Sequence, residues 1–424
     1  MSATILVLNA GSSSVKFQLF AVENHSLERQ FKGQVEGIGA KPRLIATDAH
    51  SAPLVERTFS PEQIADPIGA MEILKDWLGE YLAGRLPIAV GHRVVHGGMR
   101  FAQPVLVNDD VLAELERFVP LAPLHQPNNL VPIRAIRELL PDMPQVACFD
   151  TAFHRGHGEL ADRFAIPQSL YDEGVRRYGF HGLSYEYIAS VLPDMAPEVA
   201  TGRVIVAHLG NGASLCAIHE GHSVDSSMSF TALDGLPMGT RPGQLDAGVV
   251  LYLISHKGMS PQDVEHLLYH DCGLKGLSGI SNDVRDLLAS QDPHARLALD
   301  FFAYRAAKEA CALASVLGGL DAIVFTAGIG ENSPEVRQAV CDRLAWLGVA
   351  LDEKANSQNA RRISQRGTQP SVYVIPTDEE QMVAMHTLQV IETDGAAEAT
   401  AGPRLGAGRF RPNITGMNQI GGQR

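Results

Sequence analysis

The sequence predicts an α/β protein built from two copies of one βββαβαβα-like unit around a central cleft. An apolar strand, a Gly-containing polar turn and an outgoing strand occupy residues 5–20, and the same order returns at residues 203–218. After each copy, segments with helical apolar spacing alternate with short buried strands. Because duplicated units place equivalent turns at equivalent edges, we expect the two Gly turns to face one cleft.

The first copy begins with strands and then alternates helices with strands. Strand-like runs are expected at residues 5–8, 15–20, 34–38 and 43–47, followed by a helix over about residues 61–82. A strand at residues 88–95, helices near residues 109–118 and 130–139, and a buried strand at residues 146–150 complete the unit. This order predicts a first domain over residues 1–150.

The second copy has a long helix at about residues 294–317, a strand at residues 322–326, a Gly turn at residues 327–330 and a helix from about residue 333. It predicts a nucleotide-binding domain over residues 151–383. A late helix around residues 379–391 is expected to pack on the first domain and complete it with about residues 384–393. Residues 394–424, rich in Gly, Ala, Pro, Arg and Asn, are expected to form a flexible tail.

Composition limits the classes of partner. The 424 residues suggest two or three domains, and 35 Lys and Arg against 48 Asp and Glu give a net charge of −13. This charge argues against nucleic acid and against an anionic membrane as partners. The first residues do not resemble a signal peptide, no stretch is apolar enough to span a bilayer, and the five cysteines form no C-x-x-C pair. We therefore expect a cytoplasmic protein with free thiols.

The first turn has the composition of a phosphate site. Gly11 permits close backbone approach, Ser12 and Ser14 supply hydroxyl and N–H groups, and Lys16 adds a positive charge. The alternative is an ordinary hairpin turn, in which Gly and Ser are common for conformational reasons. The turn is not a Walker A loop, because the second glycine of that motif is absent.

Four segments place charged or titratable residues beside glycine, as phosphoryl transfer requires: residues 92–98, 149–154, 178–182 and 238–243. Arg93 and Arg241 could bind a transferring phosphoryl group, or they could be partners in structural salt bridges. His92 and His96 have the spacing of zinc ligands, but they lack the intervening Glu, and core histidines are the alternative. His154 and His157 are expected to be surface or loop residues.

Two later segments could serve a nucleotide and a metal. Residues 326–333 form a strand, a Gly turn and a helix start, which would direct N–H groups at a nucleotide; a simple helix-entry turn is the alternative. Residues 376–380 offer carboxylates that could hold Mg²⁺ with phosphate oxygens, or that merely suit a helix N-terminus.

Together these segments resemble the acetate kinase family, within the superfamily that also holds sugar kinases, actin and the heat-shock ATPases. The resemblance runs from Ile5 to about Ile391, and it rests on Leu8-Asn9-Ala-Gly-Ser-Ser-Ser-Val-Lys16, Gly91-His-Arg-Val-Val-His-Gly-Gly98, Phe149-Asp-Thr-Ala-Phe-His154, Tyr178-Gly-Phe-His-Gly182, His208-Leu-Gly-Asn-Gly212, Gly239-Thr-Arg241, Ser281-Asn-Asp283 with Arg285, and Gly328-Ile-Gly-Glu-Asn332. It implies two actin-like ATPase (ribonuclease H-like) domains and direct transfer of the γ-phosphoryl of ATP to acetate, giving acetyl phosphate and ADP. It also implies Mg²⁺, or Mn²⁺ in its place, and a homodimer.

The resemblance implies a role for each matching residue. Asn9 and Glu379 would hold the metal, and Asp150 would orient an arginine or a metal-bound water. Arg93 and Arg241 would bind the carboxylate and the transferring phosphoryl group, while His181 would stabilise the transition state. The nucleotide site would comprise Ser14, Lys16, His208, Leu209, Gly210, Asn211, Gly212, Asp283, Val284, Arg285, Gly328, Ile329, Gly330 and Asn332.

The resemblance also implies a small apolar acyl pocket, formed by Val95, Leu124, Phe180 and Ala232. Ala232 stands where the family has a proline, so acetate and propionate stay open as acceptors, because one methylene is worth only about 1–3 kcal/mol in such a pocket. Tyr185 and Asp378 depart from the family's His and Asn. The alternatives are a propionate kinase with the same chemistry and a non-metabolic actin-like ATPase.

Overall fold

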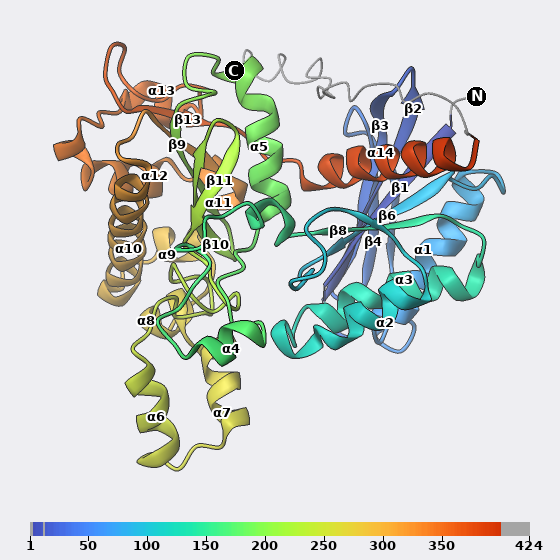
Figure 1. Cartoon of the computed structure of the whole chain (residues 1–424), viewed down its shortest axis with the longest axis horizontal. Helices are drawn as coiled ribbons and strands as arrows, with labels where there is room; N and C mark the ends of the chain where they lie inside the picture. Colours follow the sequence, from blue (N-terminus) through green and yellow to red (C-terminus); the bar gives the residue numbers. More distant parts are fainter. Residues whose placement is uncertain (1–2, 12, 400–424) are drawn as a thin grey trace. The chain divides into compact units, whose positions relative to one another are not determined.

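The computed structural model describes residues 3–11 and 13–399, which form two compact units. Unit 1 contains the described residues up to Ala152 and those from Asp378 onward. Unit 2 contains Phe153–Thr377. Each unit is built on one mixed β-sheet flanked by helices (Figure 1).

Unit 1 has an eight-stranded sheet of order β5-β4-β3-β2-β1-β6-β8-β7. Its strands are β1 (Ala3–Ala10), β2 (Ser14–Glu23), β3 (Ser26–Glu36), β4 (Arg43–Asp48), β5 (Pro53–Thr58), β6 (Ala89–Val94), β7 (Val105–Leu106) and β8 (Gln145–Phe149). Its helices are α1 (Pro67–Tyr81), α2 (Asp109–Arg117), α3 (Gln126–Leu139) and α14 (Glu379–Ala399). Single 3₁₀ turns stand at Val119–Leu121 and Ala152–His154.

Local sequence explains where α1 begins. The Asp66 carboxylate caps the helix by accepting the Gly69 N–H, and Pro67 occupies the first helical position, where its missing N–H costs nothing. The helix therefore starts six residues later than the periodicity predicts. Trp77 of α1 packs on Phe17 and Phe31 of the sheet, with ring centroids 5.4 and 5.1 Å away, and these large rings anchor the unit's core.

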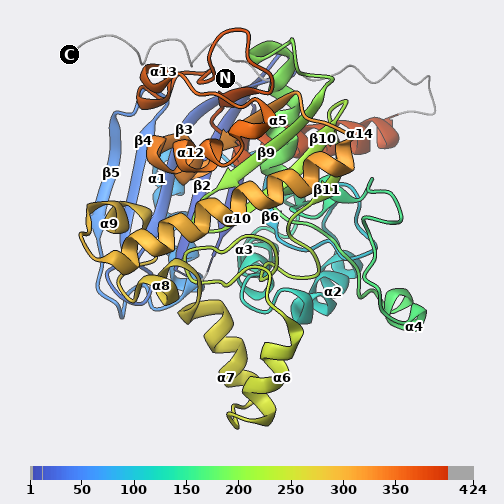
Figure 2. The ribbon, with the colours of Figure 1, turned by 90° about the vertical axis from the view of Figure 1, so that its left-hand side faces the viewer.

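Unit 2 has a five-stranded sheet of order β11-β10-β9-β12-β13. Its strands are β9 (Arg203–Leu209), β10 (Ala213–His219), β11 (His222–Ser226), β12 (Ala322–Thr326) and β13 (Ser371–Val374). Its helices are α4 (Gln168–Asp172), α5 (Gly182–Met195), α6 (Ala247–Ser255), α7 (Pro261–His266), α8 (Gly273–Ser278), α9 (Val284–Ala289), α10 (Pro293–Leu317), α11 (Ala327–Asn332), α12 (Pro334–Asp342) and α13 (Glu353–Ser357). The long helix α10 packs against β9, β10 and β11 (Figure 2).

The predicted duplication is confirmed by strand order. The strands β3-β2-β1-β6-β8 of unit 1 and β11-β10-β9-β12-β13 of unit 2 have the same order, with an antiparallel hairpin followed by parallel pairing in both. The helix after the last strand of each repeat belongs to the other unit. Helix α5 follows β8 and packs on β9, whereas α14 follows β13 and packs on β1, β6 and β8 (Figure 1).

Several elements differ from the sequence-based expectation. The pattern missed β5, β7, β11 and β13, which are short strands of two to six residues without a long apolar run. Helix α3 begins four residues before the expected start. Helix α14 continues to Ala399, so residues 394–399 are helical and not part of a tail. The rest of the expected tail, residues 400–424, lies outside the described residues.

Helices α6 and α7 form a hairpin that projects from the rest of unit 2 (Figures 1 and 2). Ser260 and Asp263 close a capping box at the start of α7, which fixes the turn between the two helices. None of the helices described is long and apolar enough to cross a membrane.

Candidate functional site

In unit 1, Arg93 lies between two carboxylates, in a group we call the Arg93 cluster: Arg93, Asp150 and Glu379. The Arg93 Nε lies 3.0 Å from Asp150 Oδ1, and Nη2 lies 2.7 Å from Oδ2. The third nitrogen, Nη1, is 3.1 Å from Glu379 Oε2. Although burial would lower the pKa of Arg93, the charges of Asp150 and Glu379 raise it above its ordinary value. The guanidinium is therefore fixed and permanently charged.

The first turn of α14 brings carboxylates to strands β1, β2 and β3. Glu380 accepts hydrogen bonds from Asn9 Nδ2 at 3.2 Å and Gln18 Nε2 at 3.3 Å, while Asp378 pairs with Arg29. Burial raises the pKa of Asp378, and Arg29 opposes this. Glu379 and Glu380 thus face different partners, Arg93 for the first and Asn9 for the second.

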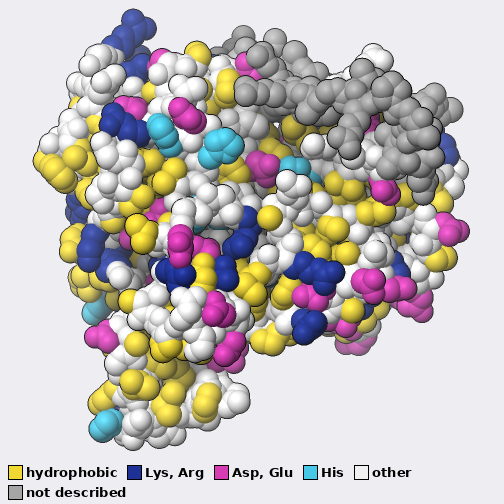
Figure 3. Space-filling model, in the orientation of Figure 1, with side chains coloured by type: hydrophobic (Ala, Val, Ile, Leu, Met, Phe, Trp, Pro, Cys, Tyr) yellow, Lys and Arg dark blue, Asp and Glu magenta, His cyan; other side chains and the backbone are white. Residues whose placement is uncertain are grey.

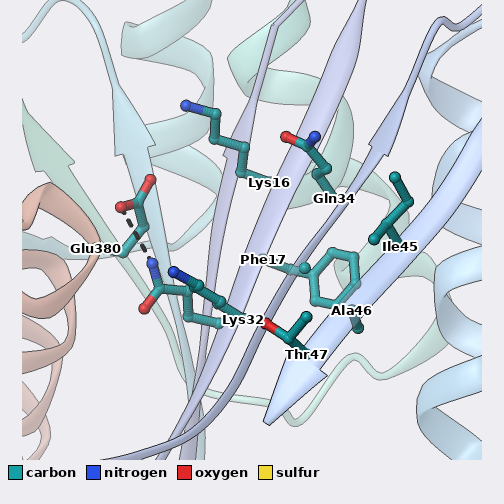
Figure 4. A pocket seen from close by; sticks show the side chains of 10 residues that line it. Lys16, Phe17, Lys32, Gln34, Ile45, Ala46, Thr47 and Glu380 are labelled. Atoms are coloured by element: carbon teal, nitrogen blue, oxygen red, sulfur yellow. Dashed lines mark hydrogen bonds between the residues drawn. The ribbon is translucent and has the colours of Figure 1, made fainter. Parts of the chain in front are cut away.

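Lys16 lies on the same face of this sheet. It is directly paired with Asn9 of β1 and Gln34 of β3, and directly paired residues of antiparallel strands share a face. A hollow of about 350 Å³ runs along this face beside Glu380 and is lined by Lys16, Lys32 and Gln34 among others (Figure 4). The Lys16 side chain is exposed and lines this hollow.

In unit 2, His181 occupies a strained position at the start of α5. Its φ of +57° is left-handed, a conformation that costs a non-glycine residue of order 1–3 kcal/mol. Its Nδ1 lies 2.8 Å from Ser214 Oγ, and the Tyr185 hydroxyl bonds the same oxygen. The His181 ring stacks on His208 with centroids 4.1 Å apart. The ring is therefore held from the side and from one face.

Arg241 lies beside His181 at the β9–β10 turn. A Cβ added at Gly212 would lie 3.2 Å from His181 Nε2 and 3.3 Å from Arg241 Nη2, so both groups border this glycine. Arg241 Nη1 donates to the Ala232 carbonyl at 2.9 Å. Burial lowers its pKa, which Tyr269 partly offsets. Among the described residues Arg241 has no ion-pair partner. The salt-bridge alternative thus holds for Arg93 and fails for Arg241.

Unit 2 also contains a pocket of about 600 Å³ formed by three segments. Of the residues predicted for a nucleotide, eight line it: Gly210, Asn211, Asp283, Val284, Arg285, Gly328, Ile329 and Asn332. Asn332 Nδ2 donates to the Gly328 carbonyl at 2.9 Å and holds the turn at the start of α11. Asp283 caps α9 and pairs with Arg285 at 2.6 Å, and its hydrogen bond with Arg285 lowers the pKa of its carboxyl.

Comparison with known proteins identifies the chain. The model of the acetokinase family matches residues 4–385. The chain belongs to the acetokinase family. It is 61% identical to an acetate kinase of Nitrobacter hamburgensis, over 92% of this chain and 96% of that protein, and 55% identical to one of Rhizobium meliloti, over 92% and 99%. The resemblance noted from the sequence motifs is therefore confirmed.

Solved structures of acetokinase relatives share the fold. A propionate kinase from Francisella tularensis superposes with a TM-score of 0.85 at 37% identity, covering 92% of this chain and all of that one. The Porphyromonas gingivalis acetate kinase superposes with a TM-score of 0.80 at 36% identity and the same coverage. The α/β fold class with one mixed sheet in each of two units, predicted from the sequence, is confirmed.

Six residues predicted for the nucleotide of this acetokinase do not line the pocket. Ser14 and Lys16 belong to unit 1, and Ser12 of their turn lies outside the described residues. In unit 2, His208 stacks on His181 and bonds Ser184 Oγ at 2.8 Å. The Leu209 side chain is fully buried in β9, and Gly330 is buried in α11. Gly212 instead borders His181 and Arg241.

The predicted acyl-pocket residues fall in both units. Val95 and Leu124 belong to unit 1, where the Val95 N–H donates to Asn129 Oδ1 at 2.9 Å. Phe180 and Ala232 belong to unit 2. The Ala232 carbonyl anchors Arg241, so this position bears on the arginine as well as on the pocket wall.

Besides His181 and His208, the sequence singled out four histidines. His154 was predicted to be a surface or loop residue, and the surface part of that prediction is wrong, although it lies in a 3₁₀ turn of a connecting segment. His154 is buried with 1% of its surface exposed, and it is not a surface residue; His157 is half-buried.

His92 and His96 are buried in the core, which was the alternative to a metal site. His92 Nε2 lies 2.8 Å from Gln145 Oε1. No group of three or more His, Cys, Asp or Glu residues within the described ranges could hold a metal.

The oxygen donors of unit 1 fit Mg²⁺ rather than a thiolate- or imidazole-binding metal. Asn9 offers an amide oxygen, Glu380 offers a carboxylate beside it, and Glu379 offers a carboxylate that pairs with Arg93. Mg²⁺ is usually held by one or two carboxylates, with waters and substrate phosphates completing its shell, so a small protein donor set suffices.

Sequence reasoning missed the residues that support the histidines and part of the pocket lining. Ser184, Tyr185 and Ser214 hold His208 and His181. Tyr185 had already stood out as a departure from the family pattern. Four pocket residues were also missed, although they adjoin predicted ones along the chain: Asn282, Leu288, Ser333 and Glu335.

Proposed function

We propose that this chain transfers the γ-phosphoryl group of ATP directly to acetate, in line and without a covalent enzyme intermediate. Acetate kinase activity is confirmed by curated acetate kinases that are 49–61% identical to this chain over most of its length. The acetate kinase family uses ATP. The direct mechanism and the residue roles are our proposal. They rest on one observation above all: Arg241, a half-buried arginine with no carboxylate partner among the described residues, borders the same glycine as a histidine held by Ser214.

The reaction makes one bond and breaks one. A carboxylate oxygen of acetate attacks the γ-phosphorus while the bond from that phosphorus to the bridging oxygen of ADP breaks. No proton need be removed, because the acceptor is already an anion. Catalysis then consists of positioning and of positive charge against the equatorial oxygens.

In unit 2, Arg241 and His181 would bind the transferring phosphoryl group. Arg241, with no ion pair to break among the described residues, is available to an anionic oxygen. His181, oriented by Ser214, would donate a hydrogen bond to the transferring group. The 600 Å³ pocket would hold the adenosine portion of ATP between the α9 and α11 starts.

Unit 1 supplies fixed charge. Arg93 would bind the acetate carboxylate, and Asp150 would keep the guanidinium in place. Asn9 with Glu379 would hold Mg²⁺, or Mn²⁺ in its place; Glu380 lies closer to Asn9 and is the second candidate. When bound, the metal would neutralise phosphate charge.

The acyl-phosphate assay tests this proposal. Purified protein is given ATP, MgCl₂ and one carboxylate, and hydroxylamine traps any acyl phosphate as a hydroxamate. Acetate should give hydroxamate in proportion to ADP, and Arg241→Lys should lose most of it because a single ammonium cannot replace a planar fork. ATP hydrolysis that ignores acetate and gives no hydroxamate would refute the proposal.

Propionate kinase activity is the second candidate. The structural relative from Francisella tularensis is titled a propionate kinase, and Ala232 is smaller than the family's proline. Comparing kcat/KM for acetate and propionate in the same assay decides between the two acceptors.

We also propose that the protein forms a homodimer through α6. None of the helix's residues is buried, and Leu251 and Tyr252 are 64% and 49% exposed. Hydrophobic side chains gather over the projecting hairpin in Figure 3. Such a patch is typical of an interface, and a second copy is the partner that the family implies. Light scattering should give a dimer for the wild type and a monomer for Leu251→Glu; a monomeric wild type would exclude it.

A cytoplasmic location stays a prediction. The five cysteines are free thiols, as a reducing compartment requires.

A further inference from the structure

We infer that His154 is a positioning residue for phosphoryl transfer, which acts by fixing the peptide between Phe180 and His181. The inference rests on the proposed role of His181. His154 lies in the 3₁₀ turn Ala152–His154, and 1% of its surface is exposed. Its Nε2 lies 2.9 Å from the Phe180 carbonyl oxygen, and its Nδ1 lies 2.8 Å from Ser223 Oγ. Both ring nitrogens therefore have a defined partner.

The partners determine which nitrogen carries the proton. A carbonyl oxygen only accepts, so Nε2 of His154 bears the hydrogen and Nδ1 accepts from the Ser223 hydroxyl. The Ser223 oxygen then accepts from His157 Nε2, which lies 2.7 Å away. In this chain of hydrogen bonds the accepting Nδ1 requires a neutral His154, whereas the donating Nε2 of His157 is compatible with a neutral or a protonated ring. Burial lowers the pKa of His154 to about 4 and of His157 to about 3, which keeps both rings uncharged at neutral pH.

The turn that His154 holds is strained. His181 has a left-handed φ of +57°, which is strained for a residue with a Cβ, and the preceding Gly179 has a φ of +76°, which glycine adopts without strain. A Cβ at Gly179 would lie 2.7 Å from Cγ and Cδ2 of His154, so the backbone passes directly against the ring. Backbone in such conformations persists only where surrounding contacts fix it. His154 supplies one contact, and the Ser229 carbonyl, which accepts the N–H groups of Tyr178 and Gly179, supplies the other.

A second connection runs through side chains. The His154 ring packs edge-on against Tyr185, with centroids 5.7 Å apart. The Tyr185 hydroxyl bonds Ser214 Oγ, which in turn bonds His181 Nδ1. His154 thus contacts both the backbone before His181 and the residue that supports its ring partner. Loss of His154 would remove its hydrogen bond to the Phe180 carbonyl and loosen the peptide before His181.

His154→Phe and His154→Gln separate hydrogen bonding from packing. Phe keeps the ring against Gly179 and Tyr185 but removes both hydrogen bonds, whereas the Gln amide can still donate to the Phe180 carbonyl. We expect His154→Phe to lower kcat about 10- to 100-fold, as a shift of about 1 Å in a catalytic group does, with KM for ATP within about twofold. His154→Gln should recover most of kcat. Tyr373→Phe, which removes one buried hydrogen bond to Glu198, is the matched control and should keep kcat.

A double-mutant cycle with His181→Ala decides whether His154 acts through His181. If it does, His154→Phe should change kcat by less than about threefold in the His181→Ala background. Equal losses in both backgrounds, or a folded His154→Phe enzyme with wild-type kcat, would overturn the inference. If His154→Phe does not fold, Ser223→Ala takes its place and is expected to lower kcat with an unchanged KM for ATP. A Ser223→Ala enzyme with wild-type kcat would then overturn the inference. A wild type that forms no acetyl phosphate would refute the proposed function, whereas an active wild type with an unaffected His154→Phe refutes only this inference.

Discussion

Arg93 and Asp150 form a two-pronged ion pair, in which Nη2 lies 2.7 Å from Oδ2 and Nε lies 3.0 Å from Oδ1. The Asp150 side chain is only 2% exposed, so breaking this pair would leave a charged group buried. Arg241 of unit 2 has no such carboxylate among the described residues, and its guanidinium donates a hydrogen bond to the Ala232 carbonyl. Removal of Arg93 and removal of Arg241 should therefore lower the unfolding free energy by different amounts.

Arg241→Ala and Arg93→Ala should separate activity from stability. We expect each variant to lower kcat/KM about 10³-fold or more, as loss of an arginine finger does. Arg93→Ala also removes the guanidinium that pairs with the buried Asp150 carboxylate and should cost about 3–5 kcal/mol of unfolding free energy. Arg241→Ala breaks no ion pair and should cost less than about 1 kcal/mol. Kinetics and urea unfolding of both variants measure the two quantities. Near-native activity of either variant would contradict the assigned role.

Asp150→Asn should lower activity by loosening Arg93. The amide can accept one hydrogen bond but carries no charge, so Arg93 is left with Glu379 as its carboxylate partner. We expect kcat/KM for acetate to fall about 10²-fold, in keeping with a misplaced catalytic group, while the KM for ATP changes little. Asp225→Asn, at a partly buried carboxylate of unit 2 near Arg177, is the control and should keep activity. An Asp150→Asn enzyme as active as the control would exclude the positioning role.

Asn332→Ala should weaken nucleotide binding specifically. The side chain lines the unit 2 pocket and holds the Gly328 carbonyl at 2.9 Å, so its loss frees the turn. We expect the KM for ATP to rise about 10-fold, which corresponds to one or two lost hydrogen bonds, with kcat within about threefold. A calorimetric titration with ADP measures the loss of nucleotide affinity directly, because no phosphoryl transfer takes place. Gln338→Ala, on an exposed face of α12, is the matched control. Unchanged ADP affinity would place the nucleotide elsewhere.

Ala232→Pro should change the acyl preference. The substitution restores the residue that the family has here and adds bulk at the predicted pocket wall. We expect the ratio of kcat/KM for acetate over propionate to rise about 10-fold, because one methylene is worth about 1–3 kcal/mol. The Ala232 carbonyl, which anchors Arg241, is retained in proline, so kcat for acetate should stay within about threefold. An unchanged ratio would show that residue 232 does not contact the acyl chain.

The buried histidines should make the protein sensitive to acid. Burial lowers the pKa of His92 from 6.5 to about 4. Between these values the unfolded chain binds a proton that the folded state does not, so the unfolding free energy falls as pH falls, by about 1.4 kcal/mol per unit for this group. Above pH 6.5 the effect is absent.

Unfolding in urea at pH 7 and pH 5 measures this dependence for unit 1. In a Trp346→Phe background, fluorescence reports Trp77 of α1, because the chain has two tryptophans. His92→Gln keeps a donor for Gln145 and does not titrate. The change of unfolding free energy with pH should therefore be smaller in this variant by about 1.4 kcal/mol per pH unit. An unchanged slope in His92→Gln would mean that His92 is protonated in the folded state at pH 5.

The sequence predicted the repeated strands and the motif order because these depend on local patterns. Strand–turn–strand segments at residues 5–20 and 203–218 carry apolar runs broken by Gly, and both became hairpins, β1–β2 and β9–β10. Strands β5 and β13 escaped prediction because a short strand is stabilised by its neighbours and not by its own periodicity. The end of α14 was misjudged because Gly395 interrupts the apolar pattern, and the helix nevertheless continues to Ala399.

The sequence by itself determined the acetokinase family, the duplicated α/β architecture and the residues with the right chemistry. The tertiary structure decided which of them are partners: that Arg93 is neutralised by Asp150 and Glu379 while Arg241 is not, that Glu380 and not Glu379 contacts Asn9, and that His154 is buried against the Phe180 carbonyl. Such pairings join residues far apart in the chain. They depend on strand order and side-chain direction, which only the packing of the whole unit fixes.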